Sequence, residues 1–273
     1  MILKINAGKM KMIKNKLKRI LEFKKYKKLG MTFSEFSSLK NHSQKETSIL
    51  FGKKIKITNS FWHLHSLNEL FIDEIYKFKS KKNRPKIIDC GSNIGLSIIF
   101  FKRLYPDSEV IAFEPDNEIF NISKYNLNQF GINDVKLFQK AVWFNEEPLI
   151  FAKTGSLGGH IVKEKAENTI EIETIRLKDL LFEKIDFLKI DIEGPEYDIL
   201  KDCGESLKNV ENIFVEYHSF VGEPQMIGEL LLILKSAGFK LYLKEAWDNM
   251  SEPFKGKSTS YFDLQLNIFG YRV

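Results

Sequence analysis

Acidic, glycine and asparagine residues interrupt an apolar stretch of the chain, KIIDCGSNIGLSIIFF, in the pattern Asp89-x-Gly91-x-Asn93-x-Gly95. Glycine permits a close backbone approach to a ligand, and asparagine tolerates left-handed backbone angles. A helix that starts after such a turn offers unpaired N–H groups to ligand oxygens. Glu114 ends a second apolar run and lies 23 residues after Gly91 (114 − 91), near the spacing at which a carboxylate meets ribose hydroxyls. The pattern predicts a nucleotide-like ligand.

The same turn distinguishes between nucleotides. A dinucleotide site favours Gly-x-Gly-x-x-Gly, whereas this turn lacks that spacing and keeps the acid Asp89, which would repel a pyrophosphate. Carboxylates instead suit a ligand with a positive charge and an amino-acid tail, such as S-adenosylmethionine. The predicted contacts with this cofactor are Asp89, Gly91, Asn93, Gly95, Ser97, Glu114, Pro115, Ala141 and Asp191.

A second group of ionisable residues occupies the block KIDIEGPEYDIL and the segment after it. Lys189 and Asp191 lie two residues apart in an extended segment, so both point to one face of a sheet. An acceptor hydroxyl must lose its proton as it attacks a methyl group, and Asp191, Glu193 and His218 are candidate proton acceptors. His218 is a plausible base because histidine titrates near neutral pH. We predict these three residues and Lys189 as the catalytic group; a structural ion pair is the alternative for Lys189.

These residues also have other readings. Asp191, Glu193 and Glu216 could hold Mg²⁺, orient two hydroxyls of a sugar and lower the pKa of one. Glu196 is expected to cap or charge the start of a helix. Trp247 is either a core residue or a surface on which a sugar stacks.

Alternating strand and helix patterns from residue 86 onward would position these side chains. Strands are predicted over 86–90, 109–113, 135–138, 186–190, 212–217 and 239–243, and helices over 95–105, 117–130, 196–202 and 224–237. This order predicts an α/β fold with a doubly wound, mostly parallel, seven-stranded sheet that binds ligands beyond the carboxyl ends of its strands.

Two further segments depart from that alternation. The last strand, 263–271, has no helix after it and is expected at an edge of the sheet in antiparallel orientation. Segments 143–152 and 169–176 are expected to form an inserted antiparallel hairpin around a glycine-rich loop, 155–160.

The N-terminal part differs in composition from the rest. Residues 1–83 are predicted to form a basic, helical extension and residues 84–273 the Rossmann-like domain. Within the extension, we expect a helix over 32–41 capped by Thr32 or Ser34, a strand over 54–58 and a helix over 66–78.

Positive charge is concentrated at the start of the chain. Residues 1–30 carry a balance of +10 and the remainder −4, which argues against a nucleic-acid groove over the main body. Residues 9–29 have the pattern of a basic amphipathic helix, which would pack on the body, on a second copy of the chain or on an anionic membrane surface. We expect a cytoplasmic protein, with contact at the inner membrane face as an alternative for the helix.

The motifs also permit a family comparison. Asp89-x-Gly91-x-Asn93-x-Gly95, Phe113-Glu114-Pro115 and above all Lys189-x-Asp191-x-Glu193-Gly194-x-Glu196 resemble the signature of the FkbM family of S-adenosylmethionine-dependent methyltransferases, over about residues 67–221. Ile98 departs from the pattern, since the family carries a hydroxyl residue there and the nearest one in this chain is Ser97.

The resemblance implies a function. It implies an O-methyltransferase that acts on a carbohydrate, polysaccharide, glycolipid or secondary-metabolite acceptor. The alternatives are a nucleic-acid methyltransferase, an NAD(P)-dependent reductase and a non-catalytic nucleotide-binding protein. A nucleic-acid enzyme that methylates nitrogen often has an Asn-Pro-Pro-Tyr-like block where this chain has Asp191-Ile-Glu193-Gly.

Overall fold

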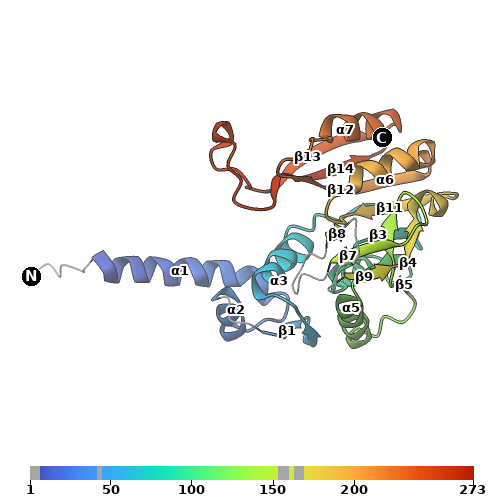
Figure 1. The fold of residues 1–273 in the computed structure, drawn as a ribbon. Helices are drawn as coiled ribbons and strands as arrows, with labels where there is room; N and C mark the ends of the chain where they lie inside the picture. The colour runs from blue at the N-terminus through green and yellow to red at the C-terminus, as the bar shows by residue number, and fades with distance from the viewer. Residues whose placement is uncertain (1–6, 42–44, 153–159, 163–168) are drawn as a thin grey trace, which may run out of the picture.

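The computed structural model describes residues 7–41, 45–152, 160–162 and 169–273. Its centre is a seven-stranded sheet with the order β13-β14-β12-β11-β3-β4-β5 (Figure 1). The strands are β3 (Lys86–Cys90), β4 (Glu109–Phe113), β5 (Lys136–Phe138), β11 (Ile185–Ile190), β12 (Val210–Phe220), β13 (Lys240–Trp247) and β14 (Phe262–Tyr271). The predicted α/β fold is confirmed.

Strand order fixes where a ligand can bind. The chain passes from β3 outward to β4 and β5, then returns to β11 on the other side of β3. The order therefore reverses beside β3, and the carboxyl ends of β3 and β11 form the topological switch point at which such sheets bind ligands. The predicted break after Cys90 lies at this point.

One strand differs in position from the prediction. β14 is antiparallel, as expected, but it lies between β12 and β13 and pairs with both, so β13 is the edge strand. An inner position buries the middle of the strand on both sides, and Asn267 and Ile268 of β14 are indeed buried.

Two hydrophobic cores cover the two faces of the sheet. Ile87 of β3 belongs to one core, with residues of α4 (Leu96–Leu104), α5 (Asn117–Gln129) and the N-terminal extension. Ile88 belongs to the other, with residues of α6 (Glu196–Cys203) and α7 (Ile227–Ser236). Successive side chains of a strand point to opposite faces, so this alternation makes the sheet doubly wound. The extension thus shares a core with the sheet, and the boundary at residue 83 stays a prediction.

The extension contains three α-helices in its described residues, α1 (Ala7–Lys27), α2 (Phe33–Lys40) and α3 (Ser60–Leu67), and a hairpin of β1 (Thr47–Leu50) and β2 (Lys53–Lys56). α1 projects from the body (Figure 1). Thr32 caps α2, as predicted, by accepting a hydrogen bond from the N–H of Glu35 (3.2 Å). No helix of the described residues is long and apolar enough to cross a bilayer.

The predicted helix over 66–78 is wrong in its bounds. α3 starts at Ser60, because the Asn59 side chain accepts from the N–H groups of Phe61 and Trp62 and caps the helix there. A π-helical segment, Asn68–Ile72, follows α3 directly. The strand β1 was not predicted; the two turn residues of its hairpin, Phe51 and Gly52, both have positive φ angles.

The insertion between β5 and β11 splits into two small sheets. β6 (Ala141–Trp143) pairs with β10 (Thr174–Arg176), and this pair is parallel, unlike the antiparallel pairing predicted. β7 (Leu149–Ala152) pairs antiparallel with β9 (Thr169–Ile172), as predicted, and with β8 (His160–Val162). A turn at Asn145, whose side chain accepts from the N–H of Glu147, separates β6 from β7. Residues 155–159 of the predicted glycine-rich loop lie outside the described residues.

Short 3-10 segments complete the chain. They are Leu177–Leu180, Gly204–Asn209 and Pro253–Lys255.

Candidate active site

Gly91 joins the carboxyl ends of β3, β4 and β11. Its N–H and that of Ser92 donate to the carbonyl oxygen of Phe113 on β4 (3.1 and 2.9 Å). Its φ angle is +88°, and a Cβ atom at this position would lie 1.9 Å from the backbone oxygen of Asp191. Any residue larger than glycine would therefore push the end of β3 away from the end of β11.

Asn93 and Glu114 connect the turn to the end of β4. Asn93 has a left-handed backbone (φ +48°), and its N–H donates to Glu114 Oε2 (3.0 Å). Glu114 Oε1 accepts from the N–H of Asp116 (3.0 Å). Glu114 is buried, and burial raises its pKa to about 7, against the lowering effect of these amide hydrogen bonds. The predicted ribose clamp therefore also holds the glycine turn in place.

Asp89 lies fully buried beneath the turn. Its Oδ2 accepts a hydrogen bond from Ser97 Oγ (2.5 Å) near the start of α4, which follows the left-handed Gly95 (φ +87°). Its Oδ1 lies 3.3 Å from Lys189 Nζ. The polar atoms of Asp89 thus contact the protein, so Asp89 and Ser97 support the cofactor turn from below.

Lys189 holds the same network from β11. Its Nζ lies 3.2 Å from Asp191 Oδ2 and donates to the backbone oxygen of Gly91 (2.7 Å). Burial alone would lower the pKa of Lys189, but Asp191 and Asp89 raise it above its ordinary value. A permanent positive charge therefore lies between two carboxylates. These contacts make Lys189 a positioning residue; its predicted catalytic role stays a prediction.

Two predicted cofactor residues lie around this network. Pro115 directly follows Glu114 and is half-buried. Ala141, at the start of β6, donates its N–H to the backbone oxygen of Glu173 (2.9 Å). Within the described contacts, Ala141 is therefore tied to the insertion, and its role toward a cofactor stays a prediction.

His218 and Glu196 form a buried pair beside the end of β11. His218 Nδ1 lies 3.0 Å from Glu196 Oε1, which also accepts from the N–H of Gly194 (2.9 Å). Glu196 has no exposed surface and His218 has 3%. Glu196 therefore fixes both the imidazole ring and the loop that carries Glu193.

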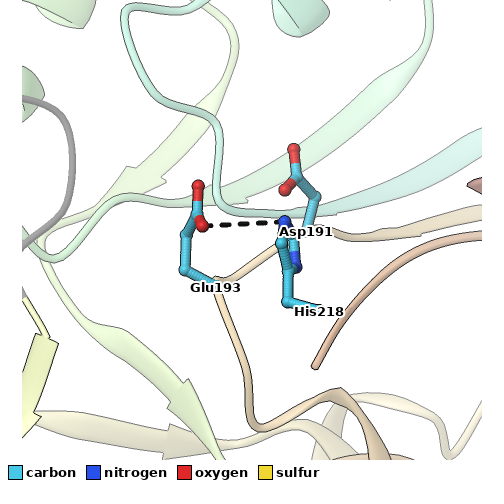
Figure 2. A group of neighbouring side chains, drawn as sticks. All are labelled: Asp191, Glu193 and His218. Atoms are coloured by element: carbon cyan, nitrogen blue, oxygen red, sulfur yellow. Dashed lines mark ion pairs between the residues drawn. The ribbon is translucent and has the colours of Figure 1, made fainter. Parts of the chain in front are cut away.

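The other ring nitrogen of His218 faces carboxylates. His218 Nε2 lies 3.6 Å from Glu193 Oε2 and 3.5 Å from Glu216 Oε1 (Figure 2 shows the Glu193 pair). Burial would lower the pKa of His218, but Glu196, Glu216 and Glu193 together raise it well above its ordinary value. The pKa of His218 therefore lies above the near-neutral value expected from the sequence.

Glu193 has a strained backbone and lies on the solvent side of His218. Its φ angle is +63°, a left-handed value that is uncommon outside glycine and concentrates at functional sites. Its side chain is half exposed, so it reaches the open side of His218. Partial burial raises the pKa of Glu193, while His218 lowers it and Asp191 raises it.

The predicted Mg²⁺ ligands are only partly brought together. Ligand atoms of Asp191, Glu193 and His218 lie within 4.8 Å of one another. Glu216, the predicted third ligand, is instead an ion-pair partner of His218. Mg²⁺ prefers oxygen ligands and water, so a set that contains an imidazole fits it poorly.

Two site residues were missed at the sequence level. Glu196 was expected only at the start of a helix; it lies there, but it also contacts His218, 22 residues away, and no local pattern signals that pairing. Tyr76, from the extension, packs against Phe214 of β12 with ring centroids 4.7 Å apart. Burial raises its pKa, and the charges of Asp191 and Glu216 raise it further.

Comparisons with known proteins match this region. Residues 89–241, more than half of the chain, match the family model described as the methyltransferase FkbM domain. The methyltransferase sdnD of Sordaria araneosa is 27% identical over 215 residues, covering 63% of this chain and 80% of that protein.

Two other relatives are named for the position they methylate. The 2-O-methyltransferase NoeI of Sinorhizobium fredii is 27% identical over 159 residues, covering 50% of this chain and 65% of its own. The 31-O-demethyl-FK506 methyltransferase FkbM of Streptomyces tacrolimicus is 24% identical over 215 residues, covering 65% and 82%.

Proposed function

Because the chain belongs to the methyltransferase FkbM domain family, we propose that it transfers the methyl group of S-adenosylmethionine to a hydroxyl oxygen of a carbohydrate, glycolipid, polysaccharide or secondary-metabolite acceptor. Membership confirms the resemblance to FkbM-type S-adenosylmethionine-dependent methyltransferases seen in the sequence, and the chain is a methyltransferase. The names of two relatives support oxygen as the methylated atom. The comparisons favour this function over a reductase or a non-catalytic binding protein.

The residues around the glycine turn fit the methyl donor. The backbone N–H groups at the start of α4 suit the carboxylate of its amino-acid tail, and Glu114 suits ribose hydroxyls, since each of its oxygens accepts one hydrogen bond and retains a further lone pair. Asp191 lies at the carboxyl end of β11, where its charge suits a sulfonium. When bound, S-adenosylmethionine supplies a methyl group that an oxygen nucleophile can take.

The observation that carries the proposal is the position of the Glu196–His218 pair beside Glu193. An acceptor hydroxyl in front of Glu193 and His218 would lie beside the imidazole ring, whose charged form would stabilise the negative charge that develops on the oxygen. Glu193 would take the O–H proton as the oxygen bonds to the methyl carbon, whose bond to sulfur breaks to leave S-adenosylhomocysteine. Glu196 holds His218 in place and compensates its charge.

Substitutions that keep size and remove charge test this assignment. His218→Asn and Glu193→Gln are expected to lower kcat about a hundredfold or more, because positioned acid–base groups contribute about that much or more. Binding of S-adenosylhomocysteine, followed by calorimetry, should stay within about twofold in both variants if each acts on the acceptor alone.

A matched control lies on the same strand. Glu211→Gln, exposed near the start of β12, should leave both measurements unchanged. Full turnover in His218→Asn and Glu193→Gln would place the proton acceptor elsewhere.

Use of Mg²⁺ through Asp191, Glu193 and Glu216 remains the alternative for this group of residues. Glu193 and Glu216 would then have to leave their contacts with His218 to bind the metal. We expect turnover to persist after dialysis against EDTA. Loss of turnover that Mg²⁺ alone restores would establish the metal instead.

The exposed face of α1 supports contact with an anionic membrane surface through residues 9–29. Leu17 and Leu21 are 55% and 61% exposed, and lysines surround them. Such helices bind anionic lipid through apolar burial and charge. We expect sedimentation with phosphatidylglycerol vesicles, but not with phosphatidylcholine vesicles, and its loss in Leu17→Asn/Leu21→Asn. Self-association of the wild type without lipid binding would instead show that the helix joins two copies of the chain. The cytoplasmic location stays a prediction.

A further inference from the structure

We propose that four aromatic side chains on α3 and β13 bind a sugar ring of the acceptor, so that the acceptor is a carbohydrate larger than one ring. The inference rests on the proposed methyl transfer and names its substrate class. The aromatic platform consists of Phe61, Trp62, His65 and Trp247.

The platform is a contiguous aromatic surface. Ring centroids lie 5.3 Å apart for Trp62 and Trp247, 5.8 Å for Phe61 and Trp247, and 5.5 Å for His65 and Trp247. Trp62 is 40% exposed and Phe61 37%. A core would bury such rings, whereas here a large part of their surface meets solvent. The C–H bonds of a sugar ring carry partial positive charge and pack well against the negative face of an aromatic ring.

Polar groups border the same surface. A cavity of about 310 Å³ is lined by His65, Trp247, Glu245, Asp248 and Ala246. Carboxylates at the edge of an aromatic surface accept hydrogen bonds from sugar hydroxyls and so orient the ring. The cavity therefore joins the two features that a polyhydroxylated ring needs, an apolar face and hydrogen-bond acceptors beside it.

Charge around the platform favours a neutral ligand. His65 forms an ion pair with Glu69 (3.2 Å), and this hydrogen bond raises the pKa of His65 above its ordinary value. Lys244 is close enough to act on His65 as well. His65 lines the cavity together with Glu245 and Asp248 and already forms an ion pair with Glu69.

The sheet places the platform beside the methyl-transfer residues. Trp247 pairs with Gln265 of β14, and Gln265 pairs with His218 of β12. Paired residues point to the same face of a sheet, so Trp247 and His218 share a face. Their Cα atoms lie about 10 Å apart, which is two strand spacings. Glu216 also acts on His65. A ligand that covers the platform and reaches His218 must extend beyond a single sugar ring.

A printed array of oligosaccharides tests the proposal. The array should contain hexoses, deoxyhexoses, N-acetylhexosamines and uronic acids in chains of two to six rings. We expect the wild type to bind at least one group of related glycans. The glycan that binds most strongly is then titrated, in soluble form, into the Trp143→Phe variant. Of the three tryptophans in the chain, this variant keeps Trp62 and Trp247, both in the platform. Its binding should change the tryptophan emission.

Platform variants and cofactor binding separate the possible failures. Trp247→Ala and Trp62→Ser should weaken the glycan at least about tenfold, as expected for loss of an aromatic contact surface. S-adenosylhomocysteine binding, measured on the same samples, reports that each variant is folded. If Trp247→Ala does not bind S-adenosylhomocysteine, Trp62→Ser decides, because Trp62 is the more exposed residue.

Each outcome has one meaning. Glycan binding that both folded variants lose supports the platform. No bound glycan on the array, glycan binding that Trp62→Ser retains, or quenching by tetramethylammonium in place of any glycan overturns it. Glycan binding without S-adenosylhomocysteine binding would keep the platform and overturn the proposed methyl transfer.

Discussion

The two sides of the site are built differently. The cofactor side, formed by the ends of β3, β4 and β11, depends on backbone groups and buried charges, such as Gly91, Asn93 and the Asp89–Lys189 pair. The proposed acceptor side, formed by α3, β12, β13 and the loop after β11, depends on side chains that reach solvent, such as Glu193, Trp62 and Phe61.

The family match follows the same division. Residues 89–241 contain the cofactor side and the Glu196–His218 pair, whereas every residue of the aromatic platform lies outside this range. Backbone geometry and buried ion pairs tolerate few substitutions, while exposed side chains can change without loss of the fold. The difference predicts that substitutions on the first side cost stability, whereas substitutions of exposed side chains on the second side leave the fold intact.

Gly91→Ala should have the largest effect. The added Cβ would meet the backbone oxygen of Asp191 at 1.9 Å, in a left-handed conformation. Overpacking and the left-handed backbone together should lower the free energy of unfolding by at least about 4 kcal/mol, measured by urea denaturation. Gly222→Ala is the matched control, because Gly222 has the same φ of +88° but open space around it. Equal effects of the two substitutions would contradict the close approach of the strands.

Asp89→Ala should destabilise nearly as much. It would leave the buried Lys189 with Asp191 as its remaining carboxylate, and breaking a buried ion pair costs about 3 to 5 kcal/mol. Asp107→Ala, at an exposed position, should change stability by less than about 0.5 kcal/mol. A stable Asp89→Ala variant with weakened cofactor binding would mean that Asp89 acts on the ligand directly.

The raised pKa of Glu114 predicts a dependence on pH. The unfolded chain loses this proton near pH 4.5, but the folded chain keeps it to about pH 7, so its contribution to stability is present at low pH and lost as pH rises through 7. Between pH 5 and pH 8, Glu114→Gln should gain about 2 to 3 kcal/mol relative to the wild type in urea denaturation. A difference that stays constant over this range would rule out a buried carboxylate of raised pKa.

Glu196→Gln tests the link between the two sides. The amide would keep one oxygen for the N–H of Gly194 but lose the negative charge beside His218. We expect kcat to fall about a hundredfold, with KM for S-adenosylmethionine unchanged within about twofold. A rise in KM for the donor with normal kcat would assign Glu196 to the cofactor side instead.

More of the cofactor side than of the acceptor side could be predicted from the sequence. Gly91, Asn93 and Glu114 could be predicted because backbone requirements limit the residue type at each position, and the spacing of the strands follows from the hydrophobic pattern. The ion pair of Asp89 with Lys189 could not be predicted, because Lys189 lies 100 residues away on a strand whose register depends on the whole sheet.

The acceptor side was harder to predict for the same reason. Trp247 was predicted as either a core residue or a surface on which a sugar stacks, and its contacts with Trp62 and His65 join segments at opposite ends of the chain. The position of β14 inside the sheet, which brings β13 into register with β12, has no local signal either. Contacts between distant segments therefore limited the prediction more than residue types did.

Calorimetry with S-adenosylhomocysteine tests the central claim most directly. The account predicts one bound molecule per wild-type chain, binding at least about tenfold weaker in Glu114→Ala, and unchanged binding in His218→Asn. Glu114→Ala is the informative variant because it removes the carboxylate that holds the glycine turn and that we propose as the ribose contact. Absence of binding to the wild type, or equal binding by Glu114→Ala, would contradict a cofactor site at the ends of β3 and β4.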